Sequence, residues 1–280
     1  MDTHRTDRPH PHVPDAEPQA GTRLSALEIH DNILAPGEEE LRRPAGALFW
    51  SALASGLVIG YSFLAGGFVA SLAPAELRHA AAAAVYPLGF ILVIMARSEL
   101  FTENTLVPVI PLLNRRDRET FRQLVRVWAT LLIGNLLGAL AYSMVLARTP
   151  MVSADLHPPL LEIATRATEG GFWIVAYQAV FAGWLIALLS WLLAATRATG
   201  AQLVLIWLTT APIAAFTFRH SIAGAVEAFY RAAVGAAPWG AMLGEFVLPA
   251  VLGNAVGGVL LVALLNYSQV AAERAKRAPV

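Results

Sequence analysis

The fold is decided by the stretch Phe218-Arg219-His220-Ser221-Ile222-Ala223, which lies in an otherwise apolar segment from about Gln202 to Val234. An apolar segment of that length can cross the hydrocarbon core of a bilayer. Ionisable residues such as Arg219 and His220 are costly at that depth, and they usually face the interior of a helix bundle or a pore. The stretch therefore predicts a membrane span that is interrupted where it serves a function.

A second polar stretch, Arg97-Ser98-Glu99-Leu100-Phe101-Thr102-Glu103-Asn104, interrupts another apolar segment. Two interrupted spans in one chain are typical of discontinuous helices that meet at a membrane transport site. Unwound backbone is tolerated within a membrane only where it lies against protein or a wet cavity. The alternative is that both breaks only kink two helices for packing. The gathering of Arg, His, Glu and Thr at the breaks favours transport.

The composition also indicates a membrane protein. Of the 280 residues, 56% are hydrophobic and 14% are charged, whereas a soluble domain carries about 25% charged residues. The chain has no cysteine, which excludes disulfides, thiolate metal sites and thiol catalysis. We expect a lipid bilayer around the chain, and we expect no cofactor, no metal and no nucleic acid partner.

We predict an all-α membrane protein with six transmembrane helices, of which the second and the fifth are broken. The transporter domain covers residues 45–266. The expected spans are, in order, 45–72, 79–113, 125–146, 172–195, 202–234 and 242–266.

The segments outside the spans are polar. Residues 1–21 are expected to form a disordered cytoplasmic tail, because they cannot bury enough apolar surface to fold alone. Residues 267–280 form a C-terminal cytoplasmic tail. Residues 22–44 form an amphipathic segment that can lie on the membrane surface. Its leucines share one helical face: Leu24, Leu27 and Leu34.

Arginine and lysine residues gather on one side of the predicted spans. That side holds Arg42, Arg43, Arg115, Arg116, Arg118, Arg122, Arg126, Arg197, Arg274, Lys276 and Arg277. The other side holds Arg78, Arg148, Arg166 and Arg231. Cytoplasmic loops carry the excess of basic residues. We therefore expect both termini in the cytoplasm, with the chain in a bacterial inner membrane.

The two halves of the chain share a motif. The sequence GNLLG lies at 134–138 in span three, and GNAVG lies at 253–257 in span six, 119 residues later. The same offset places Thr102 of the first break opposite Ser221, the neighbour of His220. Because each half has three spans, the second half enters the membrane in the opposite orientation. The pattern predicts two inverted three-helix repeats.

In such a repeat, the helices that restart after the two breaks begin from opposite sides. Each would present its first backbone amides, and a helix N-terminus favours an anion. The half-helices after Asn104 and His220 would then direct both positive ends toward the middle of one pore. A pore of this kind prefers small anions on electrostatic grounds.

Four residues are candidates for the centre of the pore. His220 would donate a hydrogen bond to a permeating ion, and it can change protonation near neutral pH. Thr102 would orient the imidazole ring from the opposite break. The alternative for His220 is a buried ring that bonds a backbone carbonyl. Asn135 and Asn254 would either hydrogen-bond across closely packed helices or contact the ion.

The arrangement resembles the formate/nitrite transporter family over nearly all of residues 40–266, and it is most similar to a divergent subgroup with an extended N-terminus. The motifs that carry the resemblance are LFTENT at 100–105, FRHSIA at 218–223, GNLLG at 134–138, LGNAVGG at 252–258 and WLIAL at 184–188. The resemblance implies an aquaporin-like protomer and a homopentamer with one pore per protomer. It implies passage of small monovalent anions such as formate or nitrite.

The resemblance also implies roles for single residues. His220 and Thr102 would form the central pair of the pore. Leu100 would form a constriction in the first break, with Tyr86 and Phe90 as its partners on the cytoplasmic side. The outer constriction has two candidates, which are Ile213 and Phe216.

The charges around the breaks depart from the family pattern. Arg219 stands where the family has Glu, Arg97 where it has Gly, and Glu103 where it has a small residue. In one account, Arg97 and Arg219 form buried ion pairs with nearby carboxylates. The carboxylates available for such pairs are Glu99, Glu103, Glu169 and Glu227. In the other account, Arg219 raises the positive potential beside His220 and attracts anions. The first account is preferred.

The sequence therefore predicts an anion channel or a proton-linked anion transporter. A neutral-solute pore is the alternative, although no Asn-Pro-Ala motif opens either half-helix. A non-conducting membrane scaffold or sensor is a further alternative, and the long N-terminal tail is the only feature that supports it. An enzyme is not expected, because the sequence has no metalloprotease or nucleophile-elbow motif to partner His220.

Overall fold

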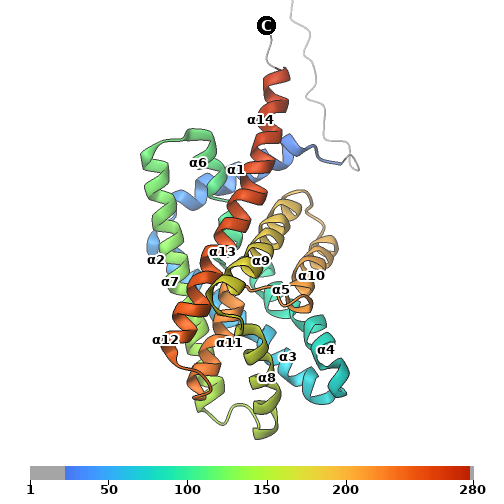
Figure 1. Ribbon diagram of the computed structural model, residues 1–280. Coiled ribbons are helices and arrows are strands. Elements are labelled where there is room, and N and C mark those ends of the chain that lie inside the picture. The colour runs from blue at the N-terminus through green and yellow to red at the C-terminus, as the bar shows by residue number, and fades with distance from the viewer. Residues whose placement is uncertain (1–22, 278–280) are drawn as a thin grey trace, which may run out of the picture.

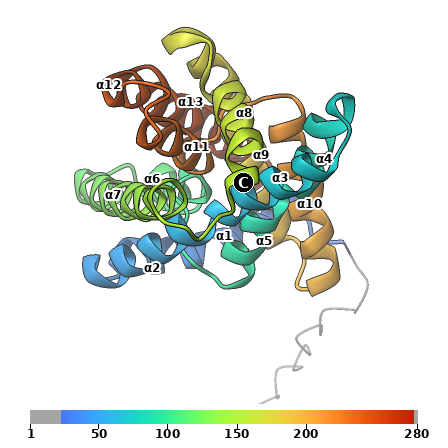
Figure 2. The ribbon, with the colours of Figure 1, turned by 90° about the horizontal axis from the view of Figure 1, so that it is seen from below.

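The computed structural model describes residues 23–277, and these residues form helices and connecting loops without any strand. The prediction of a disordered tail at 1–21 lies outside the described residues. Figure 1 and Figure 2 show, from two sides, the helices gathered into one bundle. Helices α1, α6 and α14 lie at one end of it, called the α1 face below, and α8 lies at the opposite end, called the α8 face.

The helices follow the order of the predicted spans. The first half contains α1 (Ala26–Arg42), α2 (Ala45–Val58), α3 (Gly60–Leu72), α4 (Arg78–Val85), α5 (Pro87–Met95), α6 (Val109–Arg115) and α7 (Arg118–Arg148). The second half contains α8 (His157–Thr168), α9 (Gly171–Ala194), α10 (Thr199–Ala215), α11 (Ser221–Ala233), α12 (Trp239–Ala241), α13 (Leu248–Gly258) and α14 (Leu265–Arg277). Two π-helical segments, Met242–Val247 and Val259–Leu264, join α12, α13 and α14 into one continuous helix.

Five helices among the described residues are long and apolar enough to cross a membrane. Their bounds are Ala45–Leu72, Ala75–Met95, Arg118–Arg148, Gly171–Ala194 and Trp239–Lys276. Helix α10 is also apolar but has only 17 residues. Many large apolar side chains on these helices are exposed, among them Trp50, Phe68, Trp173 and Tyr177. Such a surface fits lipid or another protein surface better than water. The prediction of an all-helical membrane protein is confirmed.

The structure differs from the prediction in three places: the first break, the loop between spans three and four, and the end of the last span. The first break is longer than expected, because only a 3₁₀ turn forms at Glu103–Thr105 and α6 begins at Val109. Pro108 and Pro111 flank that start, and proline lacks the N–H that an earlier helical turn would need. Helix α8 was not expected, because its sequence is amphipathic and falls in a loop between spans. Helix α14 continues to Arg277, beyond the predicted end of the last span.

Helix α1 lies across the α1 face (Figure 1). Ser25 and Glu28 form a capping box at its N-terminus, which satisfies two of the free backbone amides there. Its buried positions include Ile33, Gly37 and Leu41, whereas Leu24 of the predicted leucine stripe is exposed. A Cβ at Gly37 would overlap the backbone carbonyl of Val107. The buried face therefore includes this close approach to the first break, and Leu24 of the predicted stripe lies outside it.

Two helix pairs pack through the repeated Gly-Asn motifs. A Cβ at Gly56 of α2 would overlap the carbonyl of Asn135 on α7, and a Cβ at Gly183 of α9 would overlap the carbonyl of Asn254 on α13. The absence of side chains at these glycines lets each pair approach closely, as in other membrane helix pairs. This approach brings both asparagine side chains within reach of the two breaks.

Candidate transport site

The first break is held by Asn135. Helix α5 ends at Met95, and Arg97 turns the chain with a left-handed φ of 55°. The backbone N–H of Phe101 donates to Oδ1 of Asn135 at 2.8 Å. Nδ2 of Asn135 donates to the carbonyls of Glu99 at 3.0 Å and Ala52 at 2.8 Å. One amide side chain thus satisfies backbone groups that unwinding would leave unpaired.

The second break is held in the same way by Asn254. Thr217 turns the chain with a φ of 57° after α10. The backbone N–H of Ser221 donates to Oδ1 of Asn254 at 2.7 Å. Nδ2 of Asn254 donates to the carbonyls of Arg219 at 2.9 Å and Ala179 at 2.7 Å.

These bonds correct the predicted correspondence of the two breaks. The residues that bond the two asparagines correspond at an offset of 120, Glu99 to Arg219 and Phe101 to Ser221. The left-handed residues Arg97 and Thr217 are also 120 residues apart. The asparagines are 119 residues apart. The residue of the first break that is equivalent to Ser221 is therefore Phe101 and not Thr102, because the second half holds one residue fewer between its break and its asparagine. Leu100 is the counterpart of His220.

His220 and Thr102 meet at the centre of the bundle, where both are buried. Nε2 of His220 lies 2.9 Å from Oγ1 of Thr102. Nδ1 of His220 accepts from the backbone N–H groups of Ile222 at 3.2 Å and Ala223 at 3.1 Å. A nitrogen that accepts two N–H bonds carries no proton, so the neutral ring holds its proton on Nε2. This Nε2–H donates a hydrogen bond to Oγ1 of Thr102.

The side chain of His220 also changes the expected role of α11. It caps the N-terminus of α11 through Nδ1, which accepts from the amides of Ile222 and Ala223. The amide of Ser221 is bound to Asn254. The first amides of α11 are therefore already paired, and the prediction that they present a free positive helix end to an anion is wrong. The polar donors that remain at the centre are side chains.

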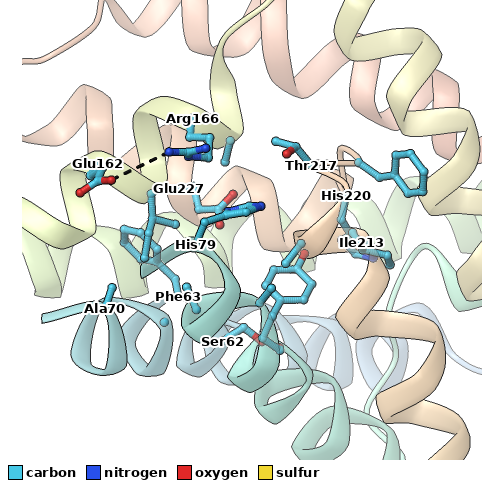
Figure 3. Close-up of a pocket in the computed structure, with 18 of the residues that line it drawn as sticks. Ser62, Phe63, Ala70, His79, Glu162, Arg166, Ile213, Thr217, His220 and Glu227 are labelled. Carbon is cyan, nitrogen blue, oxygen red and sulfur yellow. Dashed lines mark hydrogen bonds and ion pairs between the residues drawn. The ribbon is translucent and has the colours of Figure 1, made fainter. Parts of the chain in front are cut away.

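A cavity reaches this centre from the α8 face. Its walls come from α3, α4, α8, α10, α11 and the second break, and His220 is among the residues that line it (Figure 3). Ile213 lines the cavity, whereas Phe216 is 66% exposed. Of the two candidates for an outer constriction, Ile213 is thus the one beside the cavity.

The aromatic residues of the predicted constriction lie on this same cavity side. Tyr86 lines the cavity, and its ring centroid lies 5.3 Å from that of Phe90. Phe90 stands edge-on to His220 with a centroid distance of 5.0 Å. The placement of Tyr86 on the side of the termini is wrong, because α4 enters from the α8 face and Tyr86 follows its last residue. Leu100 is fully buried in the first break.

The preferred ion pairs of Arg97 and Arg219 do not occur among the residues that the structure describes. Arg219 donates instead to the carbonyls of Arg166 at 2.8 Å and Glu169 at 2.9 Å, at the C-terminal end of α8. Arg97 is exposed at the turn of the first break. A helix C-terminus has free carbonyls and a negative partial charge, so it attracts a guanidinium without a carboxylate.

The carboxylates of the first break have other partners. Glu99 pairs with Arg43, the residue after α1, at 2.5 Å, and it accepts from Nδ2 of Asn104 at 2.9 Å. Glu103 has a buried Oε1 with no hydrogen-bond partner in the described part of the chain. Sequence analysis missed the pairing of Arg43 with Glu99, because a contact over 56 residues leaves no signal in a single sequence.

Sequence analysis also missed the charges in the wall of the cavity. Arg78 lies 3.5 Å and Arg166 4.0 Å from the carboxylate of Glu162, and Figure 3 shows His79 and Glu227 beside them. These residues come from three helices, α4, α8 and α11, which the predicted spans alone did not place together.

Comparison with known proteins identifies this architecture. The formate/nitrite transporter profile matches residues 27–268. The chain belongs to the formate/nitrite transporter family. Inner membrane protein YfdC of Escherichia coli is 35% identical over 88% of this chain and 79% of its own length. A probable formate transporter of Methanothermobacter thermautotrophicus is 30% identical over 76% of this chain and 88% of its own length.

Solved structures of this transporter family share the fold. A pentameric formate channel with formate bound superposes with a TM-score of 0.67 at 22% identity, over 81% of this chain and 98% of that one. An FNT family ion channel superposes with a TM-score of 0.69 at 21% identity, over 86% of this chain and 98% of that one. As a member of the formate/nitrite transporter family, the protein is a membrane transporter and not an enzyme.

Proposed function

We propose that the protein transports small monovalent anions of weak acids, such as formate or nitrite, through one pore in each protomer, centred on His220 and Thr102. The observation that carries the proposal is the contact between these two side chains at 2.9 Å, where His220 lines the cavity from the α8 face. The contact joins the two breaks, so the passing solute meets polar groups from both halves.

The central groups can bind an anion through donors. Nε2–H of His220 is one donor, and the hydroxyl of Thr102 becomes a second when it accepts from that ring. The carbonyl of Thr102 is occupied by the hydroxyl of Thr105 at 2.7 Å. A small anion can take the place of the hydrogen bond between His220 and Thr102. It then gains a donor, and the break stays folded.

Apolar side chains surround this polar centre. Phe90 and Ile213 lie on the cavity side of His220, and Leu100 lies in the other break. A charged solute loses hydration in such surroundings, whereas the neutral acid loses much less. We infer that the anion takes up a proton before it crosses, which makes transport proton-linked and faster at low pH.

The cavity wall attracts anions. It contains three arginines and two glutamates, which are Arg78, Arg166, Arg219, Glu162 and Glu227. Glu162 is shared by Arg78 and Arg166. The excess of positive charge raises the concentration of small anions at the mouth of the cavity.

The remaining expectations belong to the same proposal. The matching hydrogen bonds of Asn135 and Asn254 support an inverted repeat. The likeness to a pentameric formate channel supports a homopentamer. The gathering of arginines on the α1 face supports cytoplasmic termini, and the relative in Escherichia coli supports an inner membrane. We also propose that residues 22–44 and 267–280 act as cytoplasmic segments around the six-span domain 45–266.

Uptake into proteoliposomes tests the function. Formate, nitrite, acetate, lactate and chloride are offered at external pH 5 to 7.5, and the internal pH is recorded with a trapped dye. We expect saturable uptake of formate or nitrite that rises at low pH and acidifies the lumen, with little flux of chloride. An intact, correctly assembled protein that moves none of these anions would refute the proposal.

A further inference from the structure

A groove lined with arginines lies on the α1 face, away from the pore. It runs between the end of α1 and the first turns of α7. Its lining includes Arg42, Arg43, Glu119, Arg122 and Arg126. Four guanidinium groups and one carboxylate give it an excess of positive charge.

Two of the arginines hold the groove together. Arg43 pairs with Glu40 at 2.9 Å and with Glu99 at 2.5 Å. Arg126 donates to the carbonyls of Leu41 at 2.7 Å and Arg43 at 2.8 Å, and so binds the end of α1 to α7. These contacts fix the walls, so the groove is a built feature and not a chance gathering of mobile side chains.

The other two arginines are open to a ligand. The side chain of Arg122 is 76% exposed, and its nearest carboxylate, Glu119, is 4.0 Å away. Arg42 is also exposed. Guanidinium groups bind phosphate with paired, charge-assisted hydrogen bonds. The groove therefore offers two exposed guanidiniums and a third, Arg126, at its wall to one phosphate group.

Apolar residues beside the groove indicate where that phosphate comes from. Helices α2 and α7 both enter their apolar spans here, at Ala45 and Arg118. Phe121 and Val125 are exposed, and they lie one position before Arg122 and Arg126 on α7, so an apolar row follows the arginine row along the helix. Trp50 is 67% exposed on α2. A phospholipid has this same order of a charged headgroup above an acyl chain.

We propose that this groove binds the headgroup phosphate of an anionic phospholipid, with the acyl chains against Trp50, Phe121 and Val125. Basic pockets at the ends of membrane helices bind anionic headgroups through Lys and Arg. The bound lipid holds the end of α1 against the start of α7. The proposal is independent of what the pore conducts.

The test uses the purified full-length protein in phosphatidylcholine bilayers, with and without phosphatidylglycerol. A ligand that binds only the folded state raises the melting temperature, so phosphatidylglycerol is expected to raise it by about 2 to 4 °C. The variant Arg42→Gln/Arg122→Gln is expected to lose most of that rise and to bind phosphatidylglycerol about tenfold more weakly. The variant Arg42→Lys/Arg122→Lys keeps both charges and is expected to keep most of the rise.

The control removes two cations of the same face outside the groove, as Arg197→Gln/Lys276→Gln, and is expected to keep the rise. An equal rise in wild type and in Arg42→Gln/Arg122→Gln would overturn the proposal. An equal rise on adding inorganic phosphate to pure phosphatidylcholine would overturn the assignment to a lipid. Where the double variant does not fold, Arg122→Gln alone decides the matter, since its exposed side chain supports no buried contact.

Discussion

At the scale of the residue, the hydrogen bonds of His220 decide what the centre of the proposed pore can do. Its Nδ1 accepts from two backbone amides of α11, so a proton can be added there only by breaking both bonds. The ring therefore works as a neutral donor through Nε2–H toward Thr102. In the proposed mechanism, the proton that accompanies the anion must then come from the solvent side of the cavity.

The first prediction concerns Thr102. Thr102→Val keeps the shape of the side chain but removes the hydroxyl, which leaves the buried Nε2–H of His220 without its partner. An unpaired buried polar group costs about 1 to 3 kcal/mol, and the variant also removes the second donor proposed for the anion, so we expect formate uptake at least about tenfold slower. Thr102→Ser restores the hydroxyl and should restore most of the flux. Equal flux in Thr102→Val and wild type would exclude this hydroxyl from transport.

The second prediction concerns Asn254. Asn254→Ala removes three hydrogen bonds to the second break and to α9. Each bond contributes about 1 kcal/mol, and the abandoned backbone groups are buried. We expect a loss of about 2 to 4 kcal/mol, measured as a fall in melting temperature. Asn266→Ala, on the same long helix beyond the site, is the control and should change the melting temperature little.

At the scale of the element, each break is fastened to the short helix that precedes its half of the chain. Arg43, which follows α1, pairs with Glu99 of the first break. Arg219 of the second break donates to the carbonyl of Glu169, which follows α8. The two contacts occupy equivalent places, because Glu99 and Arg219 are equivalent residues, but the first is an ion pair and the second is a bond to a backbone carbonyl. Helices α1 and α8 therefore each position one break.

The third prediction concerns Arg219. Two guanidinium nitrogens bind two carbonyls at the end of α8, which a lysine ammonium cannot reproduce in the same planar geometry. In Arg219→Lys we expect faster amide hydrogen exchange in the last turn of α8 and in the second break. Arg148→Lys, an exposed arginine at the end of α7, should leave both segments protected. Unchanged exchange in Arg219→Lys would show that α8 does not need this cap.

The fourth prediction concerns the start of α7. Asp117 caps this helix by accepting from the backbone N–H of Thr120 at 2.8 Å, and this bond with the Thr120 hydroxyl bond lowers its pKa below the ordinary 3.8. A lowered pKa adds stability that is present above pH about 4 and is lost as the pH falls through the folded-state value. Asp117→Ala should lower the melting temperature at pH 6. At pH 3 the melting temperatures of wild type and variant should differ by less than at pH 6.

The control for the fourth prediction is Glu119→Gln, an exposed carboxylate in the same turn that pairs with Arg122. Its melting temperature should differ from wild type by the same small amount at both pH values. If Asp117→Ala behaves in this way too, the carboxylate does not cap α7.

At the scale of the whole molecule, the sequence predicted the spans and the meeting of the breaks because both rest on local pattern. Charged residues within apolar segments marked the breaks at Glu99 and Arg219, and two Gly-Asn motifs marked the repeat. Helix α8 was missed, because its amphipathic sequence has too few apolar residues to read as a span. The correspondence was one residue off, because the offset of a motif does not show where a side chain bonds.

The partners of the charged residues were also beyond the sequence. Ion pairing was expected for Arg219, but an unpaired helix end supplies carbonyls as readily as a carboxylate supplies oxygens, and only the folded chain shows which is near. The pair Arg43 and Glu99 joins segments 56 residues apart. Such contacts depend on how α1 lies across the bundle, which no residue pattern in α1 specifies.

The central claim is that anions pass the donor pair of His220 and Thr102, and the variant His220→Asn tests it most directly. Asparagine is a favoured N-cap, so its Oδ1 can accept from the amides of α11 as Nδ1 does, while the Nε2–H donor is lost. Formate uptake into proteoliposomes is measured for both proteins, with melting temperature and oligomer size as checks of folding. The account predicts a stable, assembled variant whose uptake falls at least about tenfold; wild-type uptake by that variant would contradict it.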